Sequence, residues 1–249
     1  MSPSTPWVRA HDPAARLRLF CFPYAGGGTA EYRTWADAFP GSVDLCPVIL
    51  PGRESRLGEP GYTDLDVLTP ALADALWPLM RRTPYAFVGH SMGAWIAYAL
   101  TCELRRRRRD LPEHLFLSAR RAPDVPSPRP ALYHLPEAQF IEAIQDRYNA
   151  IPQKILDNPT FLRMFLPGLR ADFTLLDTWT PPEEPPLAVP ITAFVGTQDA
   201  VVPAASVREW RRFTTESFQL RQMPGGHFFL RESSDLFTEA IAGTLRRYL

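Results

Sequence analysis

The sequence lacks a net charge, contains few cysteines and has almost no lysine. Its 27 basic residues, of which only Lys154 is a lysine, balance 27 acidic ones. The overall electrostatic field therefore gives no reason to expect a nucleic acid or an anionic membrane as partner. The three cysteines, Cys21, Cys46 and Cys102, are odd in number and scattered among apolar neighbours. This pattern predicts free, buried thiols and a reducing compartment rather than a disulfide framework.

The chain also lacks the marks of a secretory leader and of a membrane-spanning run. Residues 1–20 carry several charges and no apolar stretch that ends in a small-residue cleavage site, unlike a signal peptide. The longest central stretch without Asp, Glu, Lys or Arg is 83–102, and it contains Pro84, Gly89 and Gly93. A lipid-spanning helix would not combine these residues with the polar ones between them. We therefore expect a cytoplasmic protein without a membrane anchor.

The length of 249 residues is typical of a single α/β domain. Short apolar runs that are typical of strands alternate with runs of helical periodicity. Such alternation predicts a mostly parallel sheet with helices on both faces. The expected strands are 17–22, 43–50, 85–89, 114–118, 191–196 and 218–222, and the expected helices are 30–39, 65–80, 94–107 and 233–249.

The segment from about residue 121 to 188 breaks this alternation. It begins and ends rich in proline and contains helix-like stretches at 136–148, 158–165 and 169–176. We interpret it as a helical lid inserted into a single domain that spans 1–249. The alternative is a set of extra helices packed permanently on the core.

The strongest local motif is Gly89-His90-Ser91-Met92-Gly93, between an expected strand and an expected helix. A serine hydroxyl is a poor nucleophile at neutral pH and must be presented at a sharp turn beside a base. The pattern matches the GxSxG nucleophile elbow of the α/β-hydrolase fold, in which small residues flank a strained serine at the carboxyl edge of the sheet. Ser91 is therefore the candidate nucleophile. The alternative is a tight turn without a catalytic role.

A serine nucleophile also needs two N–H groups to stabilise the oxyanion that forms on attack. In this architecture one belongs to the residue after the nucleophile and the other to an early strand-to-helix loop. These rules predict Met92 and Ala25, with Tyr24 or Gly26 as neighbouring choices for the second donor. The alternative for the Gly-rich loop is a phosphate cradle, which the absence of GxGxxG spacing and of a following Lys-Ser/Thr disfavours.

The general base is expected near the C-terminus, on a loop after the last strand. Gly225-Gly226-His227 fits, because two glycines let the loop curl back over the sheet toward Ser91. His90 follows the serine's strand directly, and its side chain is expected to point elsewhere. The remaining histidines compete poorly with His227 for this role; they are His11, His114 and His134.

The acid that orients the histidine should precede it in the chain. Asp199 lies in the segment Gly196-Thr197-Gln198-Asp199 at the end of the expected strand, and the order Ser, Asp, His is the order of these hydrolases. Its carboxylate should accept the Nδ1 hydrogen of His227, which fixes the tautomer and stabilises the imidazolium. An exposed turn aspartate is the alternative. Asp172 and Asp177 lie in the expected lid and are weaker candidates.

With these residues placed, the chain resembles the type II thioesterases of polyketide and nonribosomal peptide biosynthesis, the external editing enzymes of those pathways. The resemblance spans nearly the whole chain. One departure is Ala119, where the family often has glycine. The motifs that carry the resemblance are Phe22-Pro23-Tyr24-Ala25-Gly26-Gly27-Gly28, Leu50-Pro51-Gly52-Arg53-Glu54, Gly89 to Gly93, Ser118-Ala119-Arg120-Arg121-Ala122-Pro123, Gly196 to Asp199 and Gly225-Gly226-His227.

This resemblance implies hydrolysis of a thioester between an acyl or aminoacyl group and the phosphopantetheine arm of an acyl or peptidyl carrier protein domain in a modular synthase. Ser91 would take the acyl group, and water activated by His227 would release it. The resemblance implies no metal and no cofactor beyond the phosphopantetheine of the substrate. It also gives the lid a purpose, since a long arm needs a channel.

Three further features have open interpretations. Five apolar lid residues could line that channel or simply pack within the lid. Arg53 and Glu54 could shape the entrance, although we favour pairing within their loop. The arginine run 105–109 fits a solvated helix end that complements the helix dipole, with docking of an acidic carrier as the alternative. The five apolar residues are Phe140, Ile144, Met164, Phe165 and Phe173.

Two other classes of function remain possible from the sequence. A carboxylesterase or lipase could use the same scaffold, because fold alone does not determine substrate. A non-catalytic module that binds a synthase would have no need for Ser91, Asp199 and His227 together.

Overall fold

The computed structural model describes residues 5–8 and 12–249. Residues 1–4 and 9–11 fall outside this description, so the expectation for the N-terminal segment, with Arg9 and His11, is only partly covered. None of the described helices combines the length and apolar character needed to cross a membrane. Cys21, Cys46 and Cys102 are buried and free, as the sequence predicts.

The centre of the molecule is a six-stranded sheet in the order β2-β1-β3-β4-β5-β6, with every neighbouring pair parallel. The chain order reverses between β1 and β3. In open α/β sheets, ligands bind outside the carboxyl ends of the strands at such a switch point. The strands are β1 (Leu17–Phe22), β2 (Val43–Pro47), β3 (Tyr85–His90), β4 (Leu115–Ser118), β5 (Ile191–Gly196) and β6 (Phe218–Met223).

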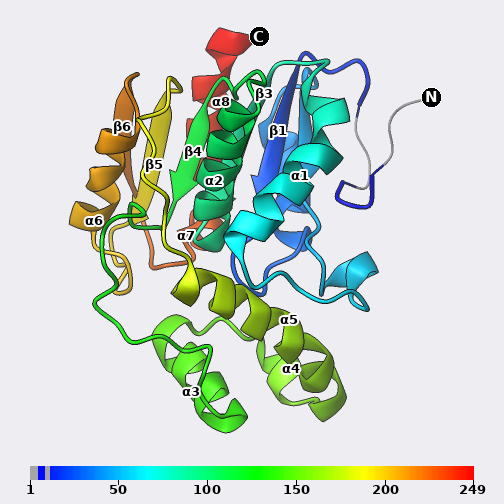
Figure 1. Ribbon diagram of the computed structural model, residues 1–249, viewed down its shortest axis with the longest axis vertical. Coiled ribbons are helices and arrows are strands. Elements are labelled where there is room, and N and C mark those ends of the chain that lie inside the picture. The colour runs from blue at the N-terminus through cyan, green and yellow to red at the C-terminus, as the bar shows by residue number, and fades with distance from the viewer. Residues whose placement is uncertain (1–4, 9–11) are drawn as a thin grey trace.

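Helices cover both faces of the sheet, which confirms the predicted α/β architecture (Figure 1). Along β1, Phe20 and Phe22 join the core on one face, whereas Leu19 and Cys21 join the core on the other, as the period of two in a strand requires. The first face carries α1 (Leu65–Met80), α2 (Met92–Arg106), α6 (Ala204–Arg208) and the 3₁₀ helix η3 (Glu209–Phe213), and the second carries η1 (Ala30–Ala38), α7 (Phe229–Glu232) and α8 (Ser234–Leu245).

Between β4 and β5 the chain forms α3 (Glu137–Tyr148), α4 (Gln153–Leu156) and α5 (Pro159–Thr178). Figure 1 shows these helices together at the carboxyl ends of the strands, opposite the C-terminus. They enclose an apolar core of their own. Its fully or almost fully buried members are Leu132, Phe140, Ile144, Ile151, Leu166, Leu169 and Phe173.

Several element boundaries differ from the sequence-based expectation. The segment after β1 is a 3₁₀ helix, and β2 ends at Pro47 rather than at residue 50. The expected helices 158–165 and 169–176 are one helix, α5, with Pro167 inside it. The last helix ends at Leu245 and is followed by the short η4 (Arg246–Tyr248). A further short 3₁₀ helix, η2 (Glu54–Arg56), follows β2.

Candidate active site

Ser91 stands at a sharp corner between the end of β3 and the start of α2. Its backbone has φ 52° and ψ −111°, a conformation that a non-glycine residue adopts only when the surrounding structure enforces it. The backbone N–H of Ser91 donates to the carbonyl of Ser118 at 2.7 Å. The corner therefore presents Ser91 at the carboxyl edge of the sheet, as the motif predicts.

The two glycines of the motif are required by close backbone packing. A Cβ atom on Gly89 would lie 2.0 Å from the carbonyl oxygen of Gly93, and one on Gly93 would lie 2.1 Å from the carbonyl oxygen of Phe22. Both distances are far below contact, and the atoms they would meet belong to the backbone. Helix α2 thus begins tight against the end of β1, where the Gly-rich loop starts.

Ser91, His227 and Asp199 meet at this edge from three separate loops. His227 Nε2 lies 3.2 Å from Ser91 Oγ, and His227 Nδ1 lies 2.8 Å from Asp199 Oδ2. The second carboxylate oxygen of Asp199 accepts the backbone N–H groups of Val201 and Val202 at 2.8 and 2.9 Å. The Asp199 side chain is fully buried and that of His227 is 6% exposed. This is the hydrogen-bond order of a nucleophile, a base and an orienting acid.

The loop that carries His227 depends on glycine and on one carboxylate. Gly225 has φ 110°, and the Glu232 carboxylate accepts the N–H of Gly226 at 2.9 Å. A Cβ atom on Gly196 would lie 2.3 Å from the carbonyl oxygen of Gly226. The loops after β5 and β6 therefore touch through their backbones, which brings the acid and the histidine together.

The two candidate oxyanion donors lie at the start of α2 and in the loop after β1. Met92 is the first residue of α2, where backbone N–H groups have no partner within the helix. Ala25 lies in the loop after β1, two residues beyond Pro23, whose carbonyl oxygen would lie 3.0 Å from a Cβ on Gly93. Within the described part of the chain, neither the Met92 nor the Ala25 N–H meets an acceptor. Their role as oxyanion donors remains a prediction.

His90 does not face Ser91, as expected, but it contacts the loop of the candidate base. Its Nε2 lies 2.9 Å from the backbone carbonyl of His227, and its Nδ1 lies 2.9 Å from Ser118 Oγ. Burial lowers the pKa of His90 well below its usual value, so the ring is neutral. A neutral ring beside a carbonyl carries its hydrogen on Nε2, which leaves Nδ1 to accept from the Ser118 hydroxyl.

Replacing His90 with phenylalanine is expected to lower kcat by roughly tenfold with little change in KM. The substitution leaves the carbonyl of His227 without its buried donor, a penalty of about 1–3 kcal/mol that the loop relieves by shifting. Steady-state kinetics alongside a thermal melt measure this effect. Ser118→Ala removes only the bond to Nδ1 and should have a smaller effect. Equal kcat in wild type and His90→Phe would remove His90 from any positioning role.

An ion pair joins helix α5 to the loop after β2, and both of its side chains also bind the backbone of the Gly-rich loop. Asp172 is 3% exposed, and its Oδ2 accepts the N–H of Gly26 at 2.7 Å while its Oδ1 pairs with Arg53 at 2.6 Å. Arg53 in turn donates to the carbonyl of Gly27 at 2.8 Å. We call these contacts of Asp172 and Arg53 with Gly26 and Gly27 the Asp172 clamp. Both carboxylate oxygens of Asp172 are used in it, so Asp172 does not orient the histidine. A carboxylate already occupies the loop, which argues against the phosphate-cradle alternative.

Arg53 and Glu54 each have partners elsewhere, and the described part of the chain shows no ion pair between the two. Arg53 reaches across to the lid, and Glu54 accepts from the backbone N–H and the hydroxyl of Thr29 at 2.6 and 2.9 Å. The sequence offered no signal for the Arg53–Asp172 pair, because its members lie 119 residues apart.

Helix α3 also contacts the candidate base. The ring of Tyr148, the last residue of α3, lies 5.3 Å from the imidazole of His227 between centroids. Of the five apolar residues considered for a channel, three are buried in the lid's own core: Phe140, Ile144 and Phe173. Met164 is 48% exposed. Phe165 packs toward Gly26, where a Cβ would come within 2.9 Å of its ring.

Residues 17–249 match the family model described as the thioesterase domain. The chain belongs to this family. This thioesterase is 39% identical over 238 residues to the gramicidin S biosynthesis protein GrsT of Aneurinibacillus migulanus, covering 96% of this chain and 92% of the relative.

Solved structures agree with the family match. The RedJ thioesterase of the prodiginine biosynthetic pathway in Streptomyces coelicolor superposes with a TM-score of 0.85 at 41% identity, covering 93% of this chain and 87% of the other. This similarity confirms the α/β-hydrolase fold and a hydrolase that acts on thioesters. One relative has a different name: the linear gramicidin dehydrogenase LgrE of Brevibacillus parabrevis, 42% identical over 238 residues, covering 94% of this chain and 90% of LgrE.

Proposed function

We propose that this thioesterase hydrolyses acyl or aminoacyl thioesters on the phosphopantetheine arm of carrier protein domains, as an editing enzyme of polyketide or nonribosomal peptide synthesis. The observation that carries the proposal is the Ser91–His227–Asp199 hydrogen-bond chain, in a chain whose relatives include proteins of gramicidin and prodiginine biosynthesis. The partners would be acyl or peptidyl carrier proteins, and the reaction would take place in the cytoplasm, where free buried thiols persist.

The reaction follows from the atoms in the site. His227 Nε2 takes the proton of Ser91 as its oxygen attacks the thioester carbonyl, and the resulting oxyanion is stabilised by the N–H groups of Met92 and Ala25. The C–S bond breaks, and the thiol of the arm leaves with the proton from His227. A water molecule then loses a proton to His227 and attacks the acyl-serine, which releases the acid and restores Ser91. The side chains and water suffice for every proton transfer.

We further propose that residues 1–249 form one domain and that about 121–188 act as its lid. Helices α3 to α5 have their own apolar core and contact the site through Tyr148 and the Asp172 clamp. A lid of this kind can admit a long arm and close over the acyl group.

The dehydrogenase name of LgrE suggests a second possible activity, which the site does not favour. Dinucleotide-binding loops present glycine N–H groups to a pyrophosphate. Here the Gly26 N–H is bound by the Asp172 carboxylate, whose negative charge would repel a phosphate. Hydrolysis therefore remains the function that the geometry supports best.

The decisive experiment compares a thioester with its matched oxoester. An acyl group is loaded on a carrier protein through either linkage, with the free acyl-pantetheine pair as reference, and release is followed by mass spectrometry. We expect the carrier thioester to be cleaved at least about tenfold faster than the oxoester, with the Ser91→Ala variant as the background. Brisk cleavage of simple oxoesters with no release from carriers would move the function to a carboxylesterase. Absence of any hydrolysis would favour a binding module.

A further inference from the structure

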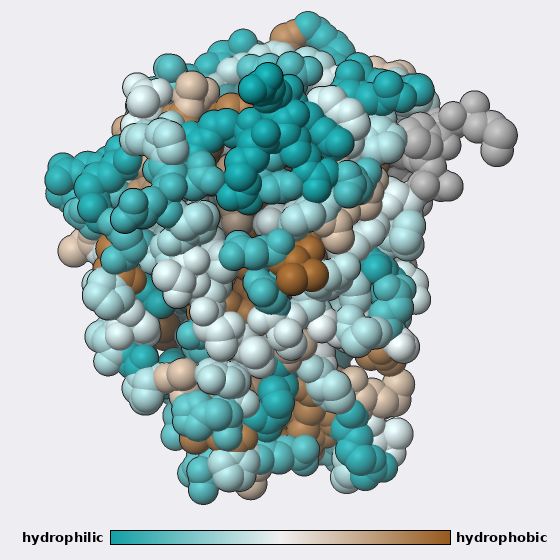
Figure 2. Space-filling view, in the orientation of Figure 1, coloured by the Kyte–Doolittle hydropathy of each residue, from teal (hydrophilic) through white to brown (hydrophobic). Residues whose placement is uncertain are grey.

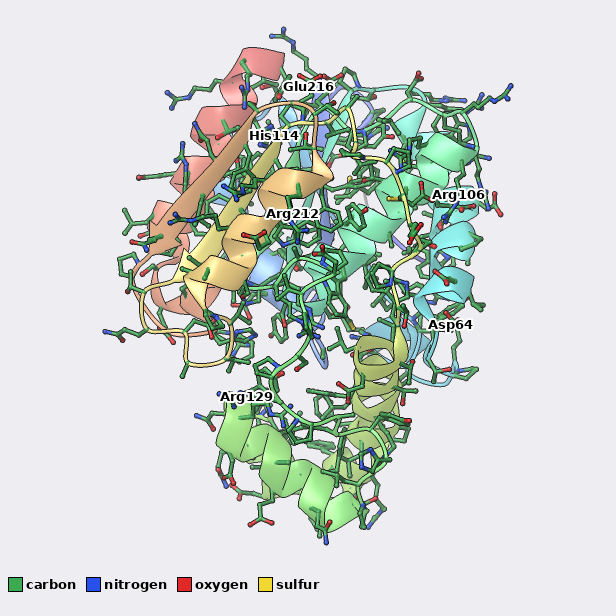
Figure 3. The ribbon with its side chains drawn as sticks, turned by 60° about the vertical axis from the view of Figure 1, so that its left-hand side comes forward. Asp64, Arg106, His114, Arg129, Arg212 and Glu216 are labelled. Atoms are coloured by element: carbon green, nitrogen blue, oxygen red, sulfur yellow. The ribbon has the colours of Figure 1, made fainter. Side chains whose placement is uncertain are left out.

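A pocket of about 200 Å³ lies next to His227, between the loop after β4, the loop after β5 and the end of α3. Four arginines line it: Arg120, Arg121, Arg129 and Arg147. Its described lining contains no aspartate and no glutamate. Arg129, labelled in Figure 3, lies where the sheet-bearing part of the molecule meets the lid. The catalytic edge thus contains a concentration of positive charge that the proposed reaction mechanism does not use.

These arginines are held in place without a direct ion pair, and the carboxylate of Asp177 acts on Arg120 and Arg121 only through space. Arg121, Arg129 and Arg147 donate to backbone carbonyls at 2.8, 2.7 and 3.2 Å. In the described part of the chain, none of the four comes within ion-pair distance of a carboxylate. A carbonyl fixes the direction of a guanidinium but leaves its charge available to a ligand.

The environment of Arg120 gives the strongest indication that the pocket binds an anion. The residue is 5% exposed, its guanidinium lies 3.6 Å from the centroid of the Trp95 ring, and its Nε has no hydrogen-bond partner among the described residues. Burial, with the neighbouring charge of Arg121, lowers the pKa of Arg120 to about 9. A buried guanidinium without a counter-ion is costly, and an anion in the pocket would offset that cost.

The contrast with the arginine run at the end of α2 is informative. Figure 2 shows a strongly hydrophilic surface over this end of the helix. There Arg105 pairs with Glu184, and Arg107 pairs with Glu103, so the charge is largely compensated within the chain. The run therefore fits a solvated helix end, whereas the uncompensated charge lies in the pocket beside His227.

We propose that the arginine pocket binds an oxyanion group of the thioester substrate, a phosphate or a carboxylate. The inference rests on the proposed function, because it concerns the substrate of the same site. Two sources supply such a group: the phosphate of the phosphopantetheine arm, and a free carboxylate on the acyl group itself. Either source would make the pocket a determinant of which thioesters this enzyme accepts.

The test compares a neutral small thioester, S-acetylpantetheine, with two that each add one anionic group: S-acetyl-4′-phosphopantetheine adds a phosphate, and S-malonylpantetheine adds a carboxylate. We expect kcat/KM to be about tenfold higher for one of the charged compounds than for the neutral one. The reason is that its anionic group would form charge-assisted hydrogen bonds with the arginines of the pocket. This preference should fall below about threefold in the double variant Arg121→Gln/Arg129→Gln, whose residues are only half-buried. The preferred compound identifies the source of the anion. Arg108→Gln removes one positive charge from an exposed position just beyond the end of α2 and should leave the preference intact.

A direct binding measurement separates this inference from the proposed function. Inorganic phosphate should raise the Tm of the wild-type protein relative to chloride at equal ionic strength, and should do so less in the double variant. The proposal that the pocket binds an anion would be overturned if the wild-type protein and the double variant had the same kcat/KM preference for charged thioesters and the same change of Tm with phosphate. If the wild-type protein hydrolyses none of the thioesters, the proposed function fails. The change of Tm with phosphate then still tests whether the pocket binds an anion.

Discussion

Replacing Ser91 with alanine is expected to lower kcat/KM for a thioester by about 10³-fold or more, because nucleophile and base act as a unit. The structure gives the reason. Ser91 Oγ is the hydroxyl that faces Nε2 of His227, at 3.2 Å, and the Ser91 backbone has a positive φ of 52°. The measurement is release of the acyl group from a carrier protein, followed by mass spectrometry. Labelling by a fluorophosphonate, which reacts with activated serines, should disappear in the same variant.

Ser217→Ala provides a matched control for this loss. Ser217 is exposed and precedes β6, at the amino end of the sheet opposite Ser91. The control should hydrolyse thioesters and accept the fluorophosphonate like the wild-type protein. Retention of more than a tenth of the wild-type rate in Ser91→Ala would show that another group attacks the thioester.

The sequence predicted the sheet and its covering helices because both depend on local patterns. The mostly apolar runs of β1 and β3 are a direct consequence of strands buried on both faces. The corner at Ser91 was predictable for a similar reason, since Gly89 and Gly93 must be small where the backbones of β1, β3 and α2 nearly touch. Both glycines lie in the same short segment as Ser91, so these constraints leave a readable motif even where the contacting backbone is distant in the chain.

The lid was harder to predict, and Pro167 shows why. A proline inside a helix removes one hydrogen bond and favours a break, so two helices were expected. The helix continues through it as α5, because Asn158 caps its start and Leu166 and Leu169, on either side of the proline, are buried in the lid core. Tertiary burial outweighed the local penalty, and the sequence does not reveal that balance.

The supporting contacts of the site were not predictable, because they join residues far apart in the chain. Asp172 reaches the Gly-rich loop over 146 residues, and His90 reaches the carbonyl of His227 over 137. No spacing rule connects such pairs. The three candidate triad residues could be named because each follows a strand that ends at the same edge. The groups that hold them in place required the structure.

Asp199→Asn is expected to reduce kcat by about 10³- to 10⁴-fold while leaving the fold intact, an effect known for this arrangement in another serine hydrolase. Asp199 Oδ1 accepts two backbone N–H groups, from Val201 and Val202. The amide oxygen of asparagine must take that place, so its NH₂ group points at Nδ1 of His227. The imidazole then has to accept at Nδ1 and carry its hydrogen on Nε2. In that tautomer Nε2 cannot take the proton of Ser91.

Asp177→Asn is the appropriate comparison, because it makes the same chemical change in the lid. Asp177 accepts the N–H groups of Leu132 and Tyr133 at 2.6 and 3.3 Å and does not contact the histidine. It should retain kcat within about threefold, whereas Asp172→Asn would be a poor control because Asp172 belongs to the clamp on the Gly-rich loop. Single-turnover kinetics and a thermal melt are measured on both variants. If Asp199→Asn keeps kcat within tenfold of wild type at an unchanged Tm, the tautomer argument fails, and His227 must be oriented by its loop and His90 alone.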